Sequence, residues 1–262
     1  MKLHGCTALI TGASAGLGRE FAQQLAPRAR ALVLVARRTD RLEELRAELT
    51  QRRPELKVHI HAVDLSKHKS VSELCGWLEQ ESLAIDFLIN NAGVGDRGPF
   101  ATADFGRVNE MAQLNVVSLT LLTHRLLPAM IAGKRGAVLN VSSSASFLPI
   151  PGMAVYAATK AYVTSFSEAL RMELRGSGIR VGALCPGPVH TEFDTVARRA
   201  DDTRQATPEF TYVPAEEVVR AALLGIERDQ PIVIPGLAMK LAMFLVRLTP
   251  MPILRFASGL AR

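Results

Sequence analysis

A tyrosine and a lysine stand four residues apart in the stretch Tyr156-Ala157-Ala158-Thr159-Lys160. In a helix, residues i and i+4 lie on the same face. A phenol normally has a pKa of about 10 and a lysine ammonium one of about 10.4. A cation beside the phenol lowers its pKa, and burial lowers that of the lysine. The pair is therefore a candidate for general acid–base chemistry; an interfacial tyrosine next to a solvated lysine is the alternative.

A second stretch, near the N-terminus, suits phosphate binding. The apolar run 6–10 leads into Thr11-Gly12-Ala13-Ser14-Ala15-Gly16-Leu17-Gly18, and a helix-favouring segment follows. Glycines let the backbone approach a pyrophosphate, and the N-terminus of the next helix offers unpaired N–H groups and the positive end of its dipole. The pattern predicts a strand, a nucleotide-binding glycine turn and a helix; a simple tight connection is the alternative.

These motifs, with others along the chain, resemble the short-chain dehydrogenase/reductase superfamily. The glycine turn has the form Thr-Gly-x-x-x-Gly-x-Gly, and the likeness covers about Thr7 to Gly236. The further matching positions are Asn90-Asn91-Ala92-Gly93, the helix asparagine Asn115, Ser143 at 13 positions before the tyrosine, and Pro186-Gly187-Pro188-Val189-His190-Thr191. In the family, the last segment contacts nicotinamide.

The resemblance implies a catalytic set of Asn115, Ser143, Tyr156 and Lys160. Tyr156 would give its proton to the developing alkoxide, and Ser143 would orient the carbonyl oxygen. Lys160 would hold the nicotinamide ribose and lower the pKa of the phenol. Asn115 would anchor a water that joins the lysine to solvent. Two alternatives remain open: a neighbouring serine, 142 or 144, faces the site instead, or Asn115 serves as a helix-to-backbone hydrogen-bonder.

The resemblance also implies a set of cofactor-binding residues. They are Gly12, Ser14, Ala15, Gly16, Leu17, Gly18, Arg37, Arg38, Asp64, Leu65, Asn91, Ala92, Gly93, Tyr156, Lys160, Pro186, Gly187, Val189 and Thr191. Asp64 would lie beside adenine, unless it only caps a helix or turn.

The residues after the second strand indicate which cofactor binds. In dinucleotide folds an acid at this place binds a free ribose 2′-hydroxyl, whereas an arginine accepts a 2′-phosphate. This chain has Ala36-Arg37-Arg38 there. A guanidinium suits a phosphate and an acid would repel it. We therefore expect NADP(H), with Arg37 on the phosphate and Arg38 more solvated.

Short apolar runs alternate with helical segments along the chain. The expected strands are 6–10, 31–35, 58–65, 85–89, 136–141, 179–184 and 230–236, and the expected helices 40–48, 70–78, 105–130, 154–175 and 214–227. This alternation predicts right-handed β-α-β crossovers and an α/β fold with a doubly wound parallel sheet, the Rossmann fold, over residues 1–236. The polar, irregular stretch 192–212 lies where the family has its substrate-covering loop.

Composition limits the classes of protein to consider. A chain of 262 residues with 48% hydrophobic content fits one domain with a large core. An apolar strand begins almost at Met1, so no secretory signal pattern is evident and a cytoplasmic protein is expected. Cys6, Cys75 and Cys185 lack metal-ligand spacing and are expected to be reduced, with no metal site. The net charge is +6, but the arginines are scattered without a nucleic-acid-binding motif, which argues against a nucleic-acid partner.

Together these features predict an NADP(H)-dependent oxidoreductase that interconverts a small-molecule carbonyl, a ketone or aldehyde, and an alcohol by hydride transfer. A non-catalytic NADP-binding sensor or scaffold is the alternative, because a fold does not fix a function. The complete reactive set argues against it. The candidate pocket residues, mostly apolar, are Val94, Phe147, Met153, His190 and Phe193. The resemblance implies a homodimer or homotetramer through helices 105–130 and 154–175; packing on the sheet alone is the alternative.

Residues 237–262 form a mostly apolar C-terminal extension. Its basic residues are Lys240, Arg247, Arg255 and Arg262. Pro250 and Pro252 interrupt it, so no helix reaches the ~20 residues that span a bilayer. Two destinations remain open. The apolar face covers the substrate pocket or a partner subunit, which the resemblance favours, or it makes a peripheral membrane contact with the basic residues toward anionic headgroups.

Overall fold

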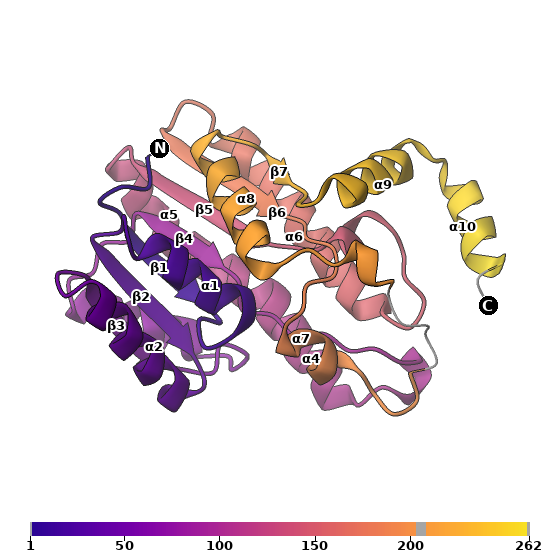
Figure 1. Ribbon diagram of the computed structural model, residues 1–262, viewed down its shortest axis with the longest axis horizontal. Coiled ribbons are helices and arrows are strands. Elements are labelled where there is room, and N and C mark those ends of the chain that lie inside the picture. Colours follow the sequence, from indigo (N-terminus) through magenta and orange to yellow (C-terminus); the bar gives the residue numbers. More distant parts are fainter. Residues whose placement is uncertain (1, 203–207, 261–262) are drawn as a thin grey trace.

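A seven-stranded parallel sheet lies between two layers of helices in the computed structural model, which describes residues 2–202 and 208–260 (Figure 1). The strands are β1 (Thr7–Thr11), β2 (Ala31–Ala36), β3 (Lys57–Ala62), β4 (Phe87–Asn90), β5 (Gly136–Val141), β6 (Ile179–Leu184) and β7 (Ile232–Val233). Their order is β3-β2-β1-β4-β5-β6-β7, which confirms the predicted doubly wound Rossmann fold.

The central strands are buried along their whole length. Every residue of β1, β2, β4 and β5 is buried, as expected for strands covered on both faces. Three strands are shorter than the sequence predicts: β4 by one residue, and β3 and β7 more markedly. β3 ends at Ala62, and Asp64 beyond it accepts hydrogen bonds from Ser66 in a turn. β7 has two residues because Pro231 and Pro235 on either side of it cannot donate to the sheet.

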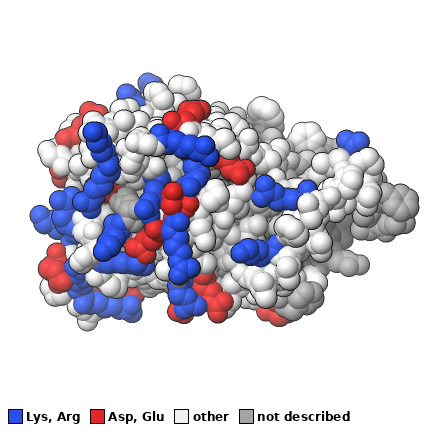
Figure 2. Space-filling view, turned by 90° about the horizontal axis from the view of Figure 1, so that it is seen from above, with Lys and Arg blue, Asp and Glu red and all other residues white. Residues whose placement is uncertain are grey.

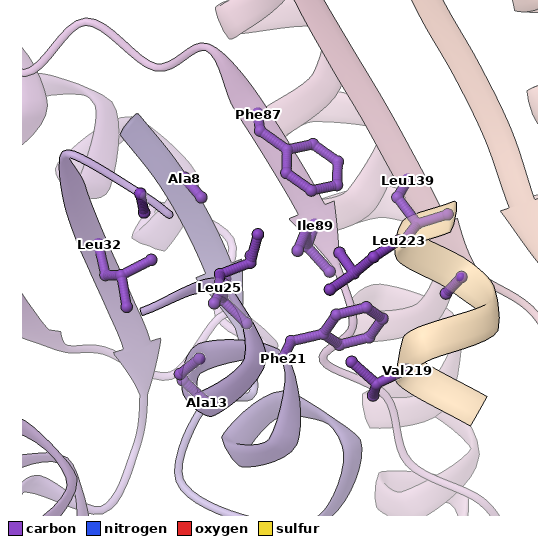
Figure 3. Close-up of a cluster of buried hydrophobic side chains, with 14 of the residues drawn as sticks. Ala8, Ala13, Phe21, Leu25, Leu32, Phe87, Ile89, Leu139, Val219 and Leu223 are labelled. Atoms are coloured by element: carbon purple, nitrogen blue, oxygen red, sulfur yellow. The ribbon is translucent and has the colours of Figure 1, made fainter. Parts of the chain in front are cut away.

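Helices cover both faces of the sheet. They are α1 (Gly16–Leu25), α2 (Thr39–Arg52), α3 (Ser70–Gln80), α4 (Phe105–Ala112), α5 (Leu119–Ala132), α6 (Ala154–Glu173), α7 (Glu192–Ala197), α8 (Ala215–Glu227), α9 (Leu237–Leu248) and α10 (Met251–Leu260). α1, α2 and α8 share one core, and α3, α5 and α6 pack against the other face. Figure 3 shows Phe21 of α1 between Phe87 and Ile89 of β4 and Val219 of α8.

The helix expected over 105–130 contains a π-helical turn. Gln113–Ser118 joins α4 to α5 with this wider hydrogen-bonding pattern, which often marks a functional site. Asn115 lies within the turn and is buried.

By length and composition alone, Phe105–Ala132 is also the one helix among the described residues that passes as a membrane span. Its residues Leu122 and Met130 belong to the core beneath the sheet, and the core helix of a soluble protein passes the same test.

The stretch 192–212 is more ordered than the sequence predicts. Residues Glu192–Ala197 form α7, because the hydroxyl of Thr191 caps the first turn by accepting from the backbone N–H of Phe193. Residues Glu209–Thr211 form a 3₁₀ turn. A parallel β-bridge joins Arg97 to Arg198 and ties the segment to the loop after β4. Residues 203–207 of the expected substrate loop lie outside the described residues.

The C-terminal extension forms two helices, α9 and α10, that project from the body of the molecule (Figure 1). α9 ends at Leu248, and α10 begins at Met251, so the break predicted from Pro250 is confirmed. Arg262 lies outside the described residues.

Candidate active site

A cavity of about 610 Å³ opens at the carboxyl ends of the central strands. It lies where the strand order reverses, because β2 and β4 stand on opposite sides of β1. Ligands of open α/β sheets bind at such switch points. Segments from almost the whole chain line it, from the glycine turn to α9.

The structure brings the residues predicted to bind a cofactor to this one cavity, with the exception of Gly18. A side chain on Gly18 would place its Cβ 2.1 Å from the carbonyl oxygen of Gly12, so this glycine lets α1 pack against the turn. Of the predicted catalytic residues, Ser143, Tyr156 and Lys160 line the cavity, whereas Asn115 does not.

Hydrogen bonds between the ends of β1 and β4 hold the glycine turn. The Thr11 hydroxyl accepts from the backbone N–H groups of Asn91 and Ala92 at 3.0 and 2.9 Å. The amide of Asn91 donates to the carbonyl of Thr11 at 2.9 Å. Gly12 has a φ of +67°, and a Cβ there would lie 2.9 Å from the Cα of Ala92. The turn therefore requires glycine and brings bare backbone to the cavity.

The N-terminus of α1 adjoins this turn and has no side-chain cap at Ala15. Its first N–H groups therefore remain available to an anion, and the positive end of the helix dipole favours one. Together with the long cavity, this arrangement fits the pyrophosphate of a dinucleotide cofactor.

Ser143 and Tyr156 both line the cavity. Ser143 follows β5, and its side chain accepts from the N–H of Ala145 at 3.1 Å. Its hydroxyl lies near enough to the phenol of Tyr156 to lower the pKa of that group. The alternative residue Ser142 is engaged elsewhere, because its hydroxyl donates to the carbonyl of Lys160 at 2.8 Å. Ser144 also lines the cavity.

Burial shifts the pKa values of both reactive groups, Tyr156 and Lys160. It raises the pKa of Tyr156 to about 12, although the hydrogen bond from Ser143 acts in the opposite direction. Burial lowers the pKa of Lys160 to about 8. The lysine nitrogen donates to the carbonyl of Val141 and lies 5.7 Å from the centre of the tyrosine ring. The expectation that Lys160 lowers the phenol pKa is wrong: burial raises this pKa, and Lys160 is not among the groups that shift it.

Asn115 bonds to protein groups with both ends of its amide. Its Oδ1 accepts from the N–H of Val94 at 3.0 Å, and its Nδ2 donates to the Val94 carbonyl at 2.9 Å and to the Thr159 hydroxyl at 3.1 Å. Asn115 thus bonds both to backbone groups and to a side chain. Asn115 fixes the segment after β4 against α6, the helix of Tyr156.

The two arginines after β2 differ in exposure and in their partners. Arg38 lies within 3.3 Å of the Ser14 hydroxyl in the glycine turn and 3.0 Å from a carboxylate oxygen of Glu192. Arg37 pairs with Glu110 of α4 at 2.9 Å, and its side chain is 56% exposed against 40% for Arg38. The expectation that Arg38 is the more solvated of the two is therefore wrong; both line the cavity.

Apolar side chains make up part of the lining beside Tyr156. Among the apolar lining residues are Val94, Ile150, Met153, Phe193, Met239 and Met243. The ring of Phe193 lies 5.4 Å from that of Tyr156. Two expected residues lie outside the lining: His190 stacks on Tyr212, and Phe147 lies beside the guanidinium of Arg247.

Sequence reasoning missed Ile150 and the two methionines of α9. The i, i+4 spacing of Met239 and Met243, which places them on one helix face, was the available signal.

A buried arginine that the sequence analysis did not single out also borders the cavity. Arg97 is 6% exposed and lies 3.4 Å from Asp194 and 3.2 Å from Asp202. Its charge is therefore matched by two carboxylates. These ion pairs hold α7 and the residues after it against the loop that follows β4. The partners stand about 100 positions from Arg97, so no local sequence pattern announces them.

Within residues 2–202 and 208–260, no group of acids, histidines and cysteines is arranged to hold a metal ion. The three cysteines are buried free thiols, as expected.

Comparison with known proteins gives consistent matches. The sequence model described as short chain dehydrogenase matches residues 6–202. Sulfoacetaldehyde reductase 2 from Chromohalobacter salexigens is 37% identical over 206 residues, which cover 78% of this chain and 79% of the relative. A short-chain dehydrogenase from Sphingobium yanoikuyae, solved with NADPH, has 34% identity and a TM-score of 0.81, covering 93% of this chain and 94% of the other. A short chain dehydrogenase/reductase from Burkholderia phymatum, solved with NAD, has 25% identity and a TM-score of 0.80, covering 94% of each chain.

Proposed function

Since the chain belongs to the short-chain dehydrogenase/reductase family and is thus an oxidoreductase of alcohol and carbonyl groups, we propose that it is an NADP(H)-dependent enzyme with Tyr156 as general acid/base. Its substrates are apolar ketones or aldehydes and the matching alcohols. One observation carries this proposal: Ser143, Tyr156 and Lys160 line a single cavity that extends to the glycine turn.

In the direction of carbonyl reduction, the phenol of Tyr156 donates its proton to the oxygen that becomes an alkoxide. With a pKa raised to about 12, the phenol retains its proton at neutral pH. The hydroxyl of Ser143 orients the same oxygen. NADPH supplies the hydride when bound. Lys160 holds the nicotinamide ribose, and Asn115 is a positioning residue that keeps α6 against the loop after β4.

The preference for NADP(H) rests on the residues beside the glycine turn. β2 is followed directly by Arg37 and Arg38, and Arg38 already reaches Ser14. Guanidinium groups suit a 2′-phosphate, which a cofactor without that phosphate leaves unused. The Sphingobium neighbour was solved with NADPH, which supports this choice. The Burkholderia neighbour was solved with NAD, so NADH is the cofactor to compare.

The preference for an apolar substrate rests on the lining near Tyr156. Phe193, Met239 and Met243 face this part of the cavity, and its buried cation Arg97 is already matched by Asp194 and Asp202. The name of the Chromohalobacter relative indicates a substrate with a sulfonate group for that protein. In the present cavity a sulfonate would find no unmatched cation near Tyr156. We therefore expect bulky apolar ketones to be turned over faster than sulfoacetaldehyde.

The test is NADPH oxidation by the purified protein with a panel of aryl and alkyl ketones, aldehydes and sulfoacetaldehyde, with identification of the alcohol formed. Turnover of apolar carbonyls supports the proposal. Tight NADPH binding without turnover of any member would favour the alternative function, a sensor or scaffold. Preferential turnover of sulfoacetaldehyde would contradict the substrate class alone.

We further propose a homodimer or homotetramer that works in the cytoplasm, with residues 1–236 as the catalytic domain and 237–262 as an extension. The helices α5 and α6 and the turn before α5 expose apolar residues, among them Val117, Leu121 and Tyr162. The Tyr162 hydroxyl lies 2.9 Å from that of Thr120 and thus joins the two helices into one surface. Light scattering coupled to size exclusion distinguishes these assemblies from a monomer.

A further inference from the structure

The side chains of α9 lie in three rows, because successive residues turn by about 100° around a helix axis. The inner row contains Met239 and Met243, which line the catalytic cavity. The outer row, on the opposite side, consists of Leu237, Leu241, Phe244, Leu245 and Leu248. Lys240 and Arg247 follow one edge between these rows.

The outer row is apolar and in contact with solvent. Its members are between 55% (Leu241) and 74% (Leu237) exposed. Met251 and Ile253 of α10 continue the exposed apolar surface at 43% and 57%. Clustered exposure of large apolar side chains marks an interaction site. In Figure 2 the described atoms at the end of the molecule that carries α9 and α10 are mostly white with a few blue side chains, whereas blue and red side chains crowd the body.

Cations border this surface in a groove of about 440 Å³ between α8, β7 and α9. Arg228, Lys240 and Arg247 line it together with the apolar side chains of Leu224 and Phe244. No Asp or Glu lines the groove, and none occurs in the sequence from 230 to 262.

The nearest acids along the chain are already paired. Glu227 is paired with Arg28 at 3.4 Å, and Asp229 with Arg171 at 2.6 Å. Over the described ranges, none of the three groove cations has an acidic partner. The groove therefore carries uncompensated positive charge beside an apolar surface.

We propose that α9 docks this protein on a lipid surface with anionic headgroups. The outer row enters the boundary between headgroups and acyl chains, and the groove cations contact headgroup phosphates. A second copy of the chain fits less well. In a two-fold dimer a patch meets itself, which would bring the same cations together without an acid between them. Because the inner row lines the catalytic cavity, the helix that touches the membrane also borders the substrate.

The experiment is co-sedimentation of the full-length protein, loaded with NADPH, with phosphatidylcholine vesicles that contain or lack phosphatidylglycerol. We expect binding to the anionic vesicles only. The double variant Lys240→Gln/Arg247→Gln should bind them roughly 30-fold more weakly, the combined effect of two basic residues at an anionic surface. The control Lys57→Gln removes an exposed cation on β3, at the opposite edge of the sheet from β7, and should bind like the parent.

A second variant, Phe244→Ser/Leu245→Ser, tests the apolar row and should also lose vesicle binding while its NADPH affinity confirms that it is folded. Parent protein that stays in the supernatant, or equal binding by Lys240→Gln/Arg247→Gln, would overturn the proposal. A smaller oligomer for Phe244→Ser/Leu245→Ser in sedimentation velocity would assign the face to a second copy instead. None of these readouts requires turnover, so the proposed reductase function stands or falls separately.

Discussion

The ammonium nitrogen of Lys160 lies 2.8 Å from the carbonyl oxygen of Val141, the last residue of β5. A second hydrogen bond joins the same two segments: the hydroxyl of Ser142 donates to the backbone carbonyl of Lys160 at 2.8 Å. These two bonds fasten α6 to the end of the strand that leads into Ser143. The distance between Ser143 and Tyr156 is therefore set by the backbone of β5.

Removal of the Lys160 charge should change how stability depends on pH. Burial lowers the pKa of Lys160 to about 8 from an ordinary 10.5, so between these values the unfolded chain binds more protons than the folded one. Below about pH 8 the folded protein holds a buried charged lysine, which lowers its stability by the full cost of that burial. Above about pH 8 the folded lysine loses its charge, so the free energy of unfolding rises with pH. Lys160→Met should lose this rise.

Urea unfolding of the cofactor-free protein at pH 7.5 and 9.5 measures the effect on Lys160→Met. Lys57→Met, on the exposed edge strand β3, is the matched control and should keep the parent slope. An unchanged slope in Lys160→Met would show that its ammonium is not buried as described.

Ser143→Ala should lower kcat for carbonyl reduction by roughly 10²–10³, the usual effect of losing one donor to a developing oxyanion. Ser144→Ala is the control, because Ser144 also lines the cavity. It should remain within a few-fold of the parent in the same steady-state assay. A larger loss in Ser144→Ala than in Ser143→Ala would exchange the roles of the two serines.

The fold and the reactive pair could be predicted because their signals are local. Alternating apolar and helical segments predict right-handed crossovers and a doubly wound parallel sheet, and the i, i+4 spacing of Tyr156 and Lys160 specifies one helix face. The family resemblance added Ser143 at its spacing.

Features that depend on long-range packing could not be predicted. The pKa of Tyr156 follows from burial, which depends on α7 and Phe193 above it. Asn115 lies in a π turn and bonds to Val94, 21 positions away along the chain. The ion pairs of Arg97 join segments about 100 positions apart.

Arg37→Ala and Arg38→Ala should each weaken NADPH binding by about 1.5–3 kcal/mol, the scale of a charge-assisted hydrogen bond, and leave NADH nearly unaffected. The control is Arg41→Ala: Arg41 pairs with Glu192 but does not line the cavity. Fluorescence titration with both cofactors measures the difference. Equal losses for NADPH and NADH would contradict recognition of the 2′-phosphate.

Arg97→Met should destabilise the protein by about 3–5 kcal/mol, because it takes the buried cation away from Asp202, whose side chain is 0% exposed. Arg198→Met is the matched control: Arg198 approaches the same carboxylate at 3.6 Å, but its side chain is 54% exposed. Arg198→Met is expected to change the free energy of unfolding by under about 1 kcal/mol. Denaturant unfolding measures the free energy of unfolding of both variants. Similar losses of stability in Arg97→Met and Arg198→Met would contradict the claim that burial makes the Arg97 ion pair the stronger one.

The central claim is that the phenol of Tyr156 supplies the proton in carbonyl reduction, and Tyr156→Phe tests it most directly. The measurement is kcat with the best ketone of the panel, with the NADPH affinity determined on the same preparation. We predict a loss of about 10²–10⁴ in kcat, the usual contribution of a general acid, and an NADPH affinity within a few-fold of the parent. Turnover by Tyr156→Phe within a few-fold of the parent would contradict the assignment.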